Sequence, residues 1–83
     1  MRVRFDVVEW DDDNSEHATR HGVSVAEIEQ AVANATAARR NKRGRAGDVR
    51  IDSVTDGGRR VVVIGAYLAA RRSLRPITAW EAE

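Results

Sequence analysis

The chain has 83 residues, of which 42% are hydrophobic and 33% are charged, and its formal net charge is +1. A chain of this length buries only about 60–65% of its unfolded surface, so we expect one domain, residues 1–83, with a small core. It contains no cysteine, which excludes a disulfide framework. No apolar run approaches the roughly 20 residues that cross a bilayer, and the opening MRVRFDVVEW lacks the apolar segment of a signal peptide. We therefore expect a cytoplasmic protein with no membrane contact.

The small net charge hides a strong asymmetry along the chain. Residues 1–38 hold three arginines and eight acidic residues, whereas residues 39–75 hold eleven basic residues and three aspartates. All but one of those basic residues are arginines, whose planar guanidinium groups form paired hydrogen bonds to phosphate and stack on bases. The second half therefore favours a surface that faces a polyanion, with a solvated charged surface as the alternative.

The chain begins with a predicted strand and helix. A short stretch rich in β-forming residues predicts a strand over about residues 3–9. The aspartates that follow, Asp11–Asp13, are typical of a helix start, because they accept the first free amide protons and oppose the helix dipole. We expect a helix over about 12–20 that ends at Gly22, since glycine adopts positive φ at little cost.

A second helix is predicted to begin after Ser24. Ser24 and Glu27 form an S-x-x-E capping box, and the helical pattern fades near Asn34. Apolar residues recur at helical spacing on one face, which we expect to be buried: Val25, Ile28 and Val32.

The remainder of the chain reads as four strands. We expect strands over about 36–42, over DVRIDSV, over about 59–67 as the central strand, and over LRPITAW. TDGGRR predicts a hairpin turn, because Asp-Gly and Gly-Gly supply positive φ values. Pro76 has no amide proton to donate, which favours an edge position or a bulge for the last strand. The predicted order is β-α-α-β-β-β-β, an α+β domain with two helices packed on one face of a curved antiparallel sheet.

Several short stretches form a recognisable set in their order along the chain. EWD at Glu9–Asp11 is followed by Asn14 and by RHGVS at Arg20–Ser24, and TDGGRRVVVI at Thr55–Ile64 precedes LRPITAWEA at Leu74–Ala82. This ordered set resembles the BrnT family of bacterial toxins over most of the chain. The resemblance implies a type II toxin with a RelE-like fold, which inhibits translation as an endoribonuclease. It also implies a partner, a small antitoxin with a DNA-binding domain, in a homo- or hetero-oligomeric complex that represses its own operon.

The chain departs from the family pattern in two places. Trp80 stands where a basic residue is common, and Glu81 and Glu83 stand in place of a basic tail. The segment Ser53–Thr55 reads SVT where the family commonly has G-x-T. The acidic end favours an alternative function, in which the same RelE-like fold is a non-catalytic module that binds a partner protein or nucleic acid.

Three residues are the candidate catalytic set. RNA cleavage in such a fold requires proton transfer from the 2′-hydroxyl and to the leaving 5′-oxygen, together with stabilisation of the charged transition state, and it needs no metal or other cofactor. Arg50 and Arg75 lie on predicted strands and are expected to face the phosphate. His21 is expected to act as acid or base, because histidine side chains change charge near neutral pH. Solvated strand positions, and a histidine that interacts with the helix dipole, are the alternatives.

Four further residues are candidates for RNA binding. Lys42, Arg43 and Arg45 lie in a predicted basic loop and are expected to hold the RNA backbone. Trp80 is expected to be an exposed platform on which a base stacks, or part of the antitoxin contact. We expect the antitoxin to dock on an exposed strand edge near Pro76 or near Ala37.

The two histidines raise the question of a metal. His17 and His21 are four residues apart and are expected to share the inner side of the first helix. The sequence is EHATRH and not H-E-x-x-H, and cysteine is absent, so no metal site is predicted. His17 is expected to pack against Trp10 or the sheet.

Overall fold

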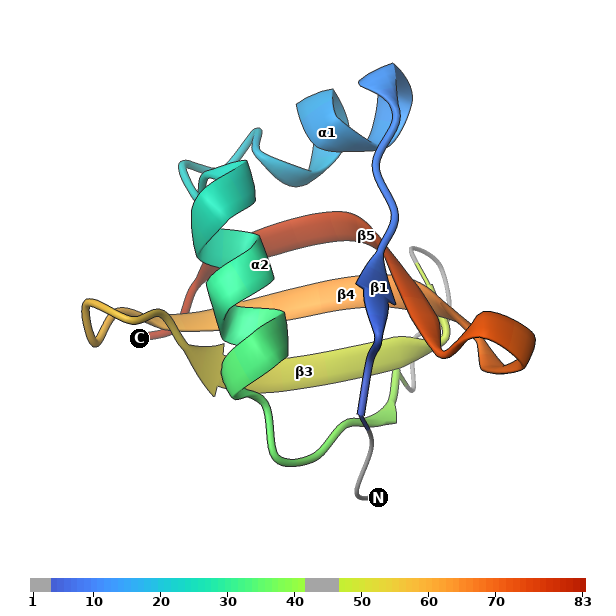
Figure 1. The fold of residues 1–83 in the computed structure, drawn as a ribbon. Helices are drawn as coiled ribbons and strands as arrows, with labels where there is room; N and C mark the ends of the chain where they lie inside the picture. Colours follow the sequence, from blue (N-terminus) through green and yellow to red (C-terminus); the bar gives the residue numbers. More distant parts are fainter. Residues whose placement is uncertain (1–3, 42–46) are drawn as a thin grey trace.

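The computed structural model describes residues 4–41 and 47–83. Two helices and a five-stranded sheet form a small α+β fold in the predicted element order (Figure 1). The elements are β1 (Val7–Val8), α1 (Asp12–Ala18), α2 (Val25–Asn34), β2 (Arg39–Arg40), β3 (Val49–Val54), β4 (Arg60–Leu68), a 3₁₀ turn (Ala69–Arg71) and β5 (Ser73–Glu81).

The sheet is mixed, so the prediction of an antiparallel sheet was wrong at one strand pair. The strand order is β1-β5-β4-β3-β2, and β1 runs parallel to β5 while the other neighbours are antiparallel. A parallel pair requires a long crossover, and here the whole chain between the first and last strands supplies it. β4 lies in the middle of the sheet, as its apolar sequence predicts.

Both predicted capping motifs are present. Asp11 is the N-cap of α1: its carboxylate accepts the amide proton of Asn14, and the Asn14 side chain accepts that of Asp11, with distances of 3.1 and 2.7 Å. Ser24 and Glu27 form the same reciprocal pair at α2. Gly22, between the helices, has a φ of +87°, but α1 ends at Ala18 with Thr19 as its C-cap, so Gly22 allows the turn to α2 and does not end the helix as predicted.

The two histidines lie on the surface, which corrects the prediction that they share the inner side of the first helix. α1 ends at Ala18, so His21 lies beyond the helix and is exposed. Asn14 and Ala18, one turn apart, occupy the buried side of α1. His17 is rotated away from that line on the helix and is exposed as well.

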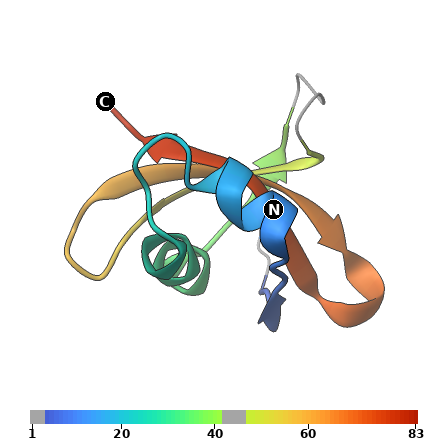
Figure 2. The same cartoon turned by 90° about the horizontal axis from the view of Figure 1, so that it is seen from above.

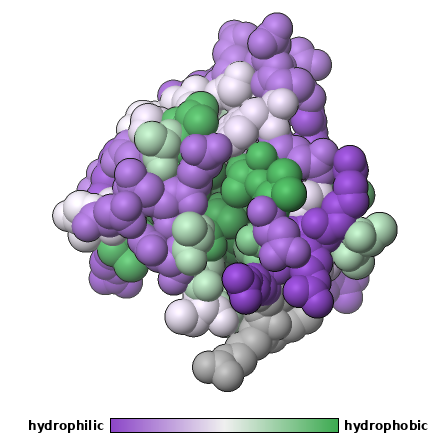
Figure 3. All heavy atoms as spheres, in the orientation of Figure 1, coloured by the Kyte–Doolittle hydropathy of each residue, from purple (hydrophilic) through white to green (hydrophobic). Residues whose placement is uncertain are grey.

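Helix α2 and one face of the sheet enclose the hydrophobic core (Figures 1 and 2). Ile28, Ala31 and Val32 of α2 are buried there, whereas Val25 is half-buried. The strands contribute Val49, Ile51, Val61, Val63, Leu74 and Ala79. On this side of the molecule, apolar atoms remain visible between α2 and β1 (Figure 3).

Two strands are shorter than expected, and Pro76 lies at a bulge. β1 and β2 are two residues long, shorter than the predicted strands over 3–9 and 36–42, of which residues 1–3 and 42 lie outside the described ranges. β5 lies between β1 and β4, but β1 pairs only with Ser73 and Leu74, so Pro76 lies beyond the end of that pairing, where its carbonyl oxygen accepts from the Asn14 side chain. The predicted antitoxin edge near Pro76 stays a prediction. The alternative of a bulge is confirmed: Gly65 pairs with Pro76 and Ile64 with Thr78, which leaves Ile77 without a partner in β4.

Candidate nucleic-acid interface

The sheet has a second face that neither helix covers (Figure 2). Side chains alternate between the two faces of a strand, so the strand register decides which residues share this face. Ile51 and Val63 point into the core opposite α2, and their neighbours along β3 and β4 therefore point the other way. We call this surface the open face; the strand residues on it are Arg39, Arg50, Asp52, Val54, Arg60, Val62, Ile64, Ala66, Arg75, Thr78 and Trp80.

Each of the four antiparallel strands contributes one arginine to the open face. Arg39 is the register partner of Arg50, and Arg60 lies opposite Val54 at the hairpin end of β3 and β4. Arg75 lies opposite Ala66 at the other end of β4. The predicted catalytic residues Arg50 and Arg75 thus share one face, although β4 lies between their strands.

Asp52 is the carboxylate among these arginines. It accepts hydrogen bonds from Arg50 at 3.1 and 3.2 Å and forms an ion pair with Arg39 at 3.1 Å. The hydrogen bonds from Arg50 lower the pKa of the Asp52 carboxyl below its ordinary value, and Arg39 adds to this effect. An exposed ion pair contributes about 1 kcal/mol or less to the stability of the fold. A phosphate group can therefore replace Asp52 as the partner of either arginine at little cost in stability.

Apolar side chains form the middle of the open face. Val62 and Ile64 are only 2% and 3% exposed, although neither helix lies over them. Val62 has Asp52 and Trp80 as its cross-strand neighbours, and Ile64 lies beside Arg50. Long side chains that lie along apolar neighbours bury them while their polar ends stay in water. Trp80 is half-buried in this arrangement, with part of its surface open to solvent.

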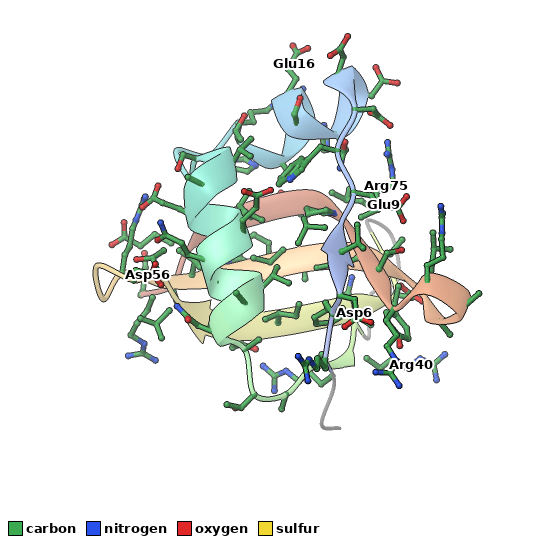
Figure 4. All side chains as sticks on the ribbon, in the orientation of Figure 1. Asp6, Glu9, Glu16, Arg40, Asp56 and Arg75 are labelled. Atoms are coloured by element: carbon green, nitrogen blue, oxygen red, sulfur yellow. The ribbon has the colours of Figure 1, made fainter. Side chains whose placement is uncertain are left out.

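Arg75 lies at the border between the open face and α1. Its guanidinium donates hydrogen bonds to the Asp11 carboxylate, and its side chain points toward the start of α1 (Figure 4). This bond is the main reason that the pKa of the Asp11 carboxyl is lowered. Arg75 also lines a hollow of about 510 Å³ between α1 and β5, to which His17 and Arg20 contribute but His21 does not.

The structure does not bring the predicted catalytic residues into one site. Arg50 lines a hollow with Arg39 and Asp52 near the β2 edge, whereas Arg75 lines the other hollow, beside α1. His21 is exposed in the turn between the helices and lines neither hollow. The predicted RNA-binding residues Lys42, Arg43 and Arg45 lie outside the described residues.

Sequence reasoning missed several residues that the fold places beside the candidates. Arg39 and Arg60 join Arg50 on the open face, and the hairpin register was the signal for Arg60, because Thr55 and Arg59 close the turn and set Arg60 opposite Val54. Trp10 is half-buried against the core, and its indole nitrogen donates to Glu29 at 3.0 Å.

Two features are absent from the part of the chain that the structure describes. Over residues 4–41 and 47–83, no three histidine or acidic side chains are grouped so that they could hold a metal ion. None of the helices in those ranges is long and apolar enough to cross a membrane.

Comparisons with known proteins give no relative. No protein-family model matches this chain, and no curated protein and no solved structure matches it either.

Proposed function

We propose that this chain is a RelE-like ribonuclease toxin of a type II toxin–antitoxin pair, and that it binds RNA on its open face in the cytoplasm. The observation that supports the proposal best is the placement of four arginines and Trp80 on the face that no helix covers. Guanidinium groups bind backbone phosphates, and an aromatic ring stacks on a base, so the two together suit single-stranded RNA.

The proposed chemistry is metal-independent. Arginines fixed beside a phosphodiester stabilise the negative charge that develops as the 2′-oxygen attacks phosphorus and the 5′-oxygen leaves. Arg50 is the candidate for this role, because it lies on the open face beside Arg39 and its carboxylate partner is exposed. His21 is retained as the proton-transfer candidate from sequence, although it lies outside the two hollows that the arginines line.

The second candidate function is a non-catalytic module that binds a partner protein or nucleic acid. The ion pairs favour it: Arg50 and Arg75 both have carboxylate partners, and an arginine already paired is less available for transition-state stabilisation. The antitoxin proposed for either function carries an acidic segment that replaces Asp52 on the arginines, or a strand that extends the sheet at the β2 edge near Ala37.

Expression of the chain alone in a bacterium separates these functions. We expect growth arrest and loss of RNA with the wild-type chain, and no arrest with Arg50→Ala. Arg40→Ala is the matched control, because Arg40 is exposed on an adjacent strand and the register places it on the other face. Absence of arrest with the wild-type chain contradicts the nuclease proposal and supports the binding module. Equal arrest with all three chains contradicts the role proposed for Arg50.

A further inference from the structure

The hollow between α1 and β5 is built from both elements. Asp13, Glu16, His17 and Arg20 line it from the side of α1. Glu16, His17 and Arg20 follow Asp13 by three, four and seven positions. The four residues therefore lie along one face of the helix and of the turn that follows it. From β5 come Arg75 and Ile77.

The β5 bulge supplies the apolar part of this hollow. Ile77 has no register partner in β4, and a bulge of this kind redirects the side chain of the extra residue. Asn14 forms part of the wall, but its amide already donates to the carbonyl oxygens of Glu9 and Pro76, each at 2.9 Å. Arg75 already donates to the Asp11 carboxylate through both terminal nitrogens, each of which carries a second N–H group. The groups that remain for a ligand are therefore these further Arg75 donors, the other charged side chains and Ile77.

Those charged side chains are balanced in sign. Arg20 and Arg75 donate hydrogen bonds only, whereas the carboxylates of Asp13 and Glu16 accept them only. A plain polyanion does not suit such a mixture, because the two carboxylates repel it. A nucleotide does suit it: its phosphate pairs with the guanidinium groups, and the amino and imino groups of its base donate to the carboxylates. Ile77 offers an apolar surface for the base.

The size and place of the hollow agree with this ligand class. Its volume of about 510 Å³ lies within the range of roughly 300–1,000 Å³ that is typical of small-molecule sites. Arg75 belongs both to the hollow and to the open face. An RNA strand that lies across the open face can therefore continue into the hollow. We propose that this hollow is a subsite for one nucleotide of a bound RNA, with a preference for a base that presents adjacent hydrogen-bond donors, such as guanine. The identity of the ligand as RNA rests on the proposed function.

The chain offers a direct reporter for the test. It has two histidines, of which His17 lines the hollow and His21 does not. The protein is prepared with ¹³C-labelled histidine, and both imidazole signals are followed by NMR. The three titrants are guanosine monophosphate, uridine monophosphate and inorganic phosphate. We expect the His17 signal to shift while His21 stays fixed, and guanosine monophosphate to bind at least about 5-fold tighter than uridine monophosphate, because uracil has a single imino donor between two acceptors.

Variants assign the two halves of the ligand. Arg20→Ala is expected to weaken both nucleotides, whereas Asp13→Asn and Glu16→Gln together are expected to remove the preference for guanine. Arg40→Ala, outside the hollow, leaves both affinities unchanged. A guanine trinucleotide is expected to bind at least about 10-fold tighter than the monophosphate; equal affinities would mean a site for free nucleotides and would overturn the RNA subsite.

The result is separable from the toxin proposal. If no nucleotide shifts the His17 signal while the chain still degrades RNA, the subsite is wrong and the proposed function stands. If the nucleotides bind as predicted but the chain degrades no RNA, the subsite stands and the nuclease proposal fails.

Discussion

Asn14 joins three parts of the fold through one side chain. It is 4% exposed, its amide donates to the carbonyl oxygens of Glu9 and Pro76, and its oxygen accepts the amide proton of Asp11. β1, α1 and β5 are therefore fixed to one another at this residue, and Arg75, next to Pro76, is placed beside α1 as a result.

Replacement of Asn14 by alanine should destabilise the protein strongly. The buried Pro76 carbonyl oxygen loses its partner, as do the part-buried Glu9 carbonyl oxygen and Asp11 amide. A fully buried unsatisfied group costs about 1–3 kcal/mol and a part-buried one less, so we expect a loss of about 2–4 kcal/mol. Urea denaturation measures this loss. Ser15→Ala is the control, because the Ser15 hydroxyl makes one weak exposed bond at 3.3 Å; equal losses for the two variants would refute the assigned role.

The stability of the fold should depend on acid pH through carboxylates with lowered pKa values. Hydrogen bonding to Arg75 lowers the pKa of Asp11 from its usual 3.8, and the Ser24 amide, followed by Arg59, lowers that of Glu27 from 4.5. A group with a lowered folded-state pKa stabilises the protein above its unfolded-state pKa, and this contribution is lost as pH falls through the folded-state value.

We therefore expect the urea midpoint to be level between about pH 7 and 5 and to fall below about pH 4. Glu27→Gln should show a smaller fall over the same interval, because that residue no longer titrates. A midpoint that stays constant down to pH 3 in the wild-type chain would show that these pairs do not stabilise the fold.

At the level of elements, the β5 bulge and a close strand approach shape the site. Gly65 of β4 lies where the register shifts, and a Cβ there would meet the Arg75 carbonyl oxygen at 2.7 Å and Leu74 Cδ1 at 3.0 Å. A Cβ on Gly47 would in turn meet the Gly65 carbonyl oxygen at 2.5 Å. Glycine is needed at both positions because the backbones come so close.

Gly65→Ala should therefore destabilise the protein by about 1–3 kcal/mol, as overpacking does, and should also displace Arg75. Gly57→Ala is a matched control, since its Cβ would have only the Thr55 hydroxyl oxygen near it, at 3.9 Å. Thermal unfolding of both variants tests this. A Gly65→Ala protein as stable as Gly57→Ala would show that the strands separate at no cost.

Elements fixed by local interactions were predictable from sequence, and those fixed by distant pairing were not. The capping boxes at Asp11 and Ser24 and the turn at Gly58 depend on residues a few positions apart. The direction of β1 depends on a partner strand 66 residues later in the chain, where Val7 pairs with Ser73. Because β1 is only two residues long, its sequence has no pattern that predicts whether it runs parallel or antiparallel. For the same reason the sequence indicated Arg50 as a strand residue but not that Arg39 lies on its face. The position of Arg60 follows from the local hairpin register and could have been predicted.

At the scale of the whole molecule, the open face and the helix-covered face differ in chemistry. The first carries four arginines, one aspartate and Trp80 on its strands, whereas α2 carries Glu27 and Glu29 and no basic residue. The charge asymmetry along the chain thus becomes an asymmetry between two sides of the fold. A polyanion is expected to bind the open face, and an acidic partner competes with it there.

The salt dependence of RNA binding tests this claim most directly. Each phosphate contact on single-stranded RNA contributes about 0.7 to the slope of log affinity against log salt concentration. We predict that the slope of log RNA affinity against log salt concentration is smaller by about 2 in a triple variant of the purified protein, Arg39→Ala, Arg50→Ala and Arg60→Ala. Arg40→Ala alone, on the other face, is expected to leave the slope unchanged. Equal slopes for the triple variant and the wild-type protein would contradict RNA binding on the open face.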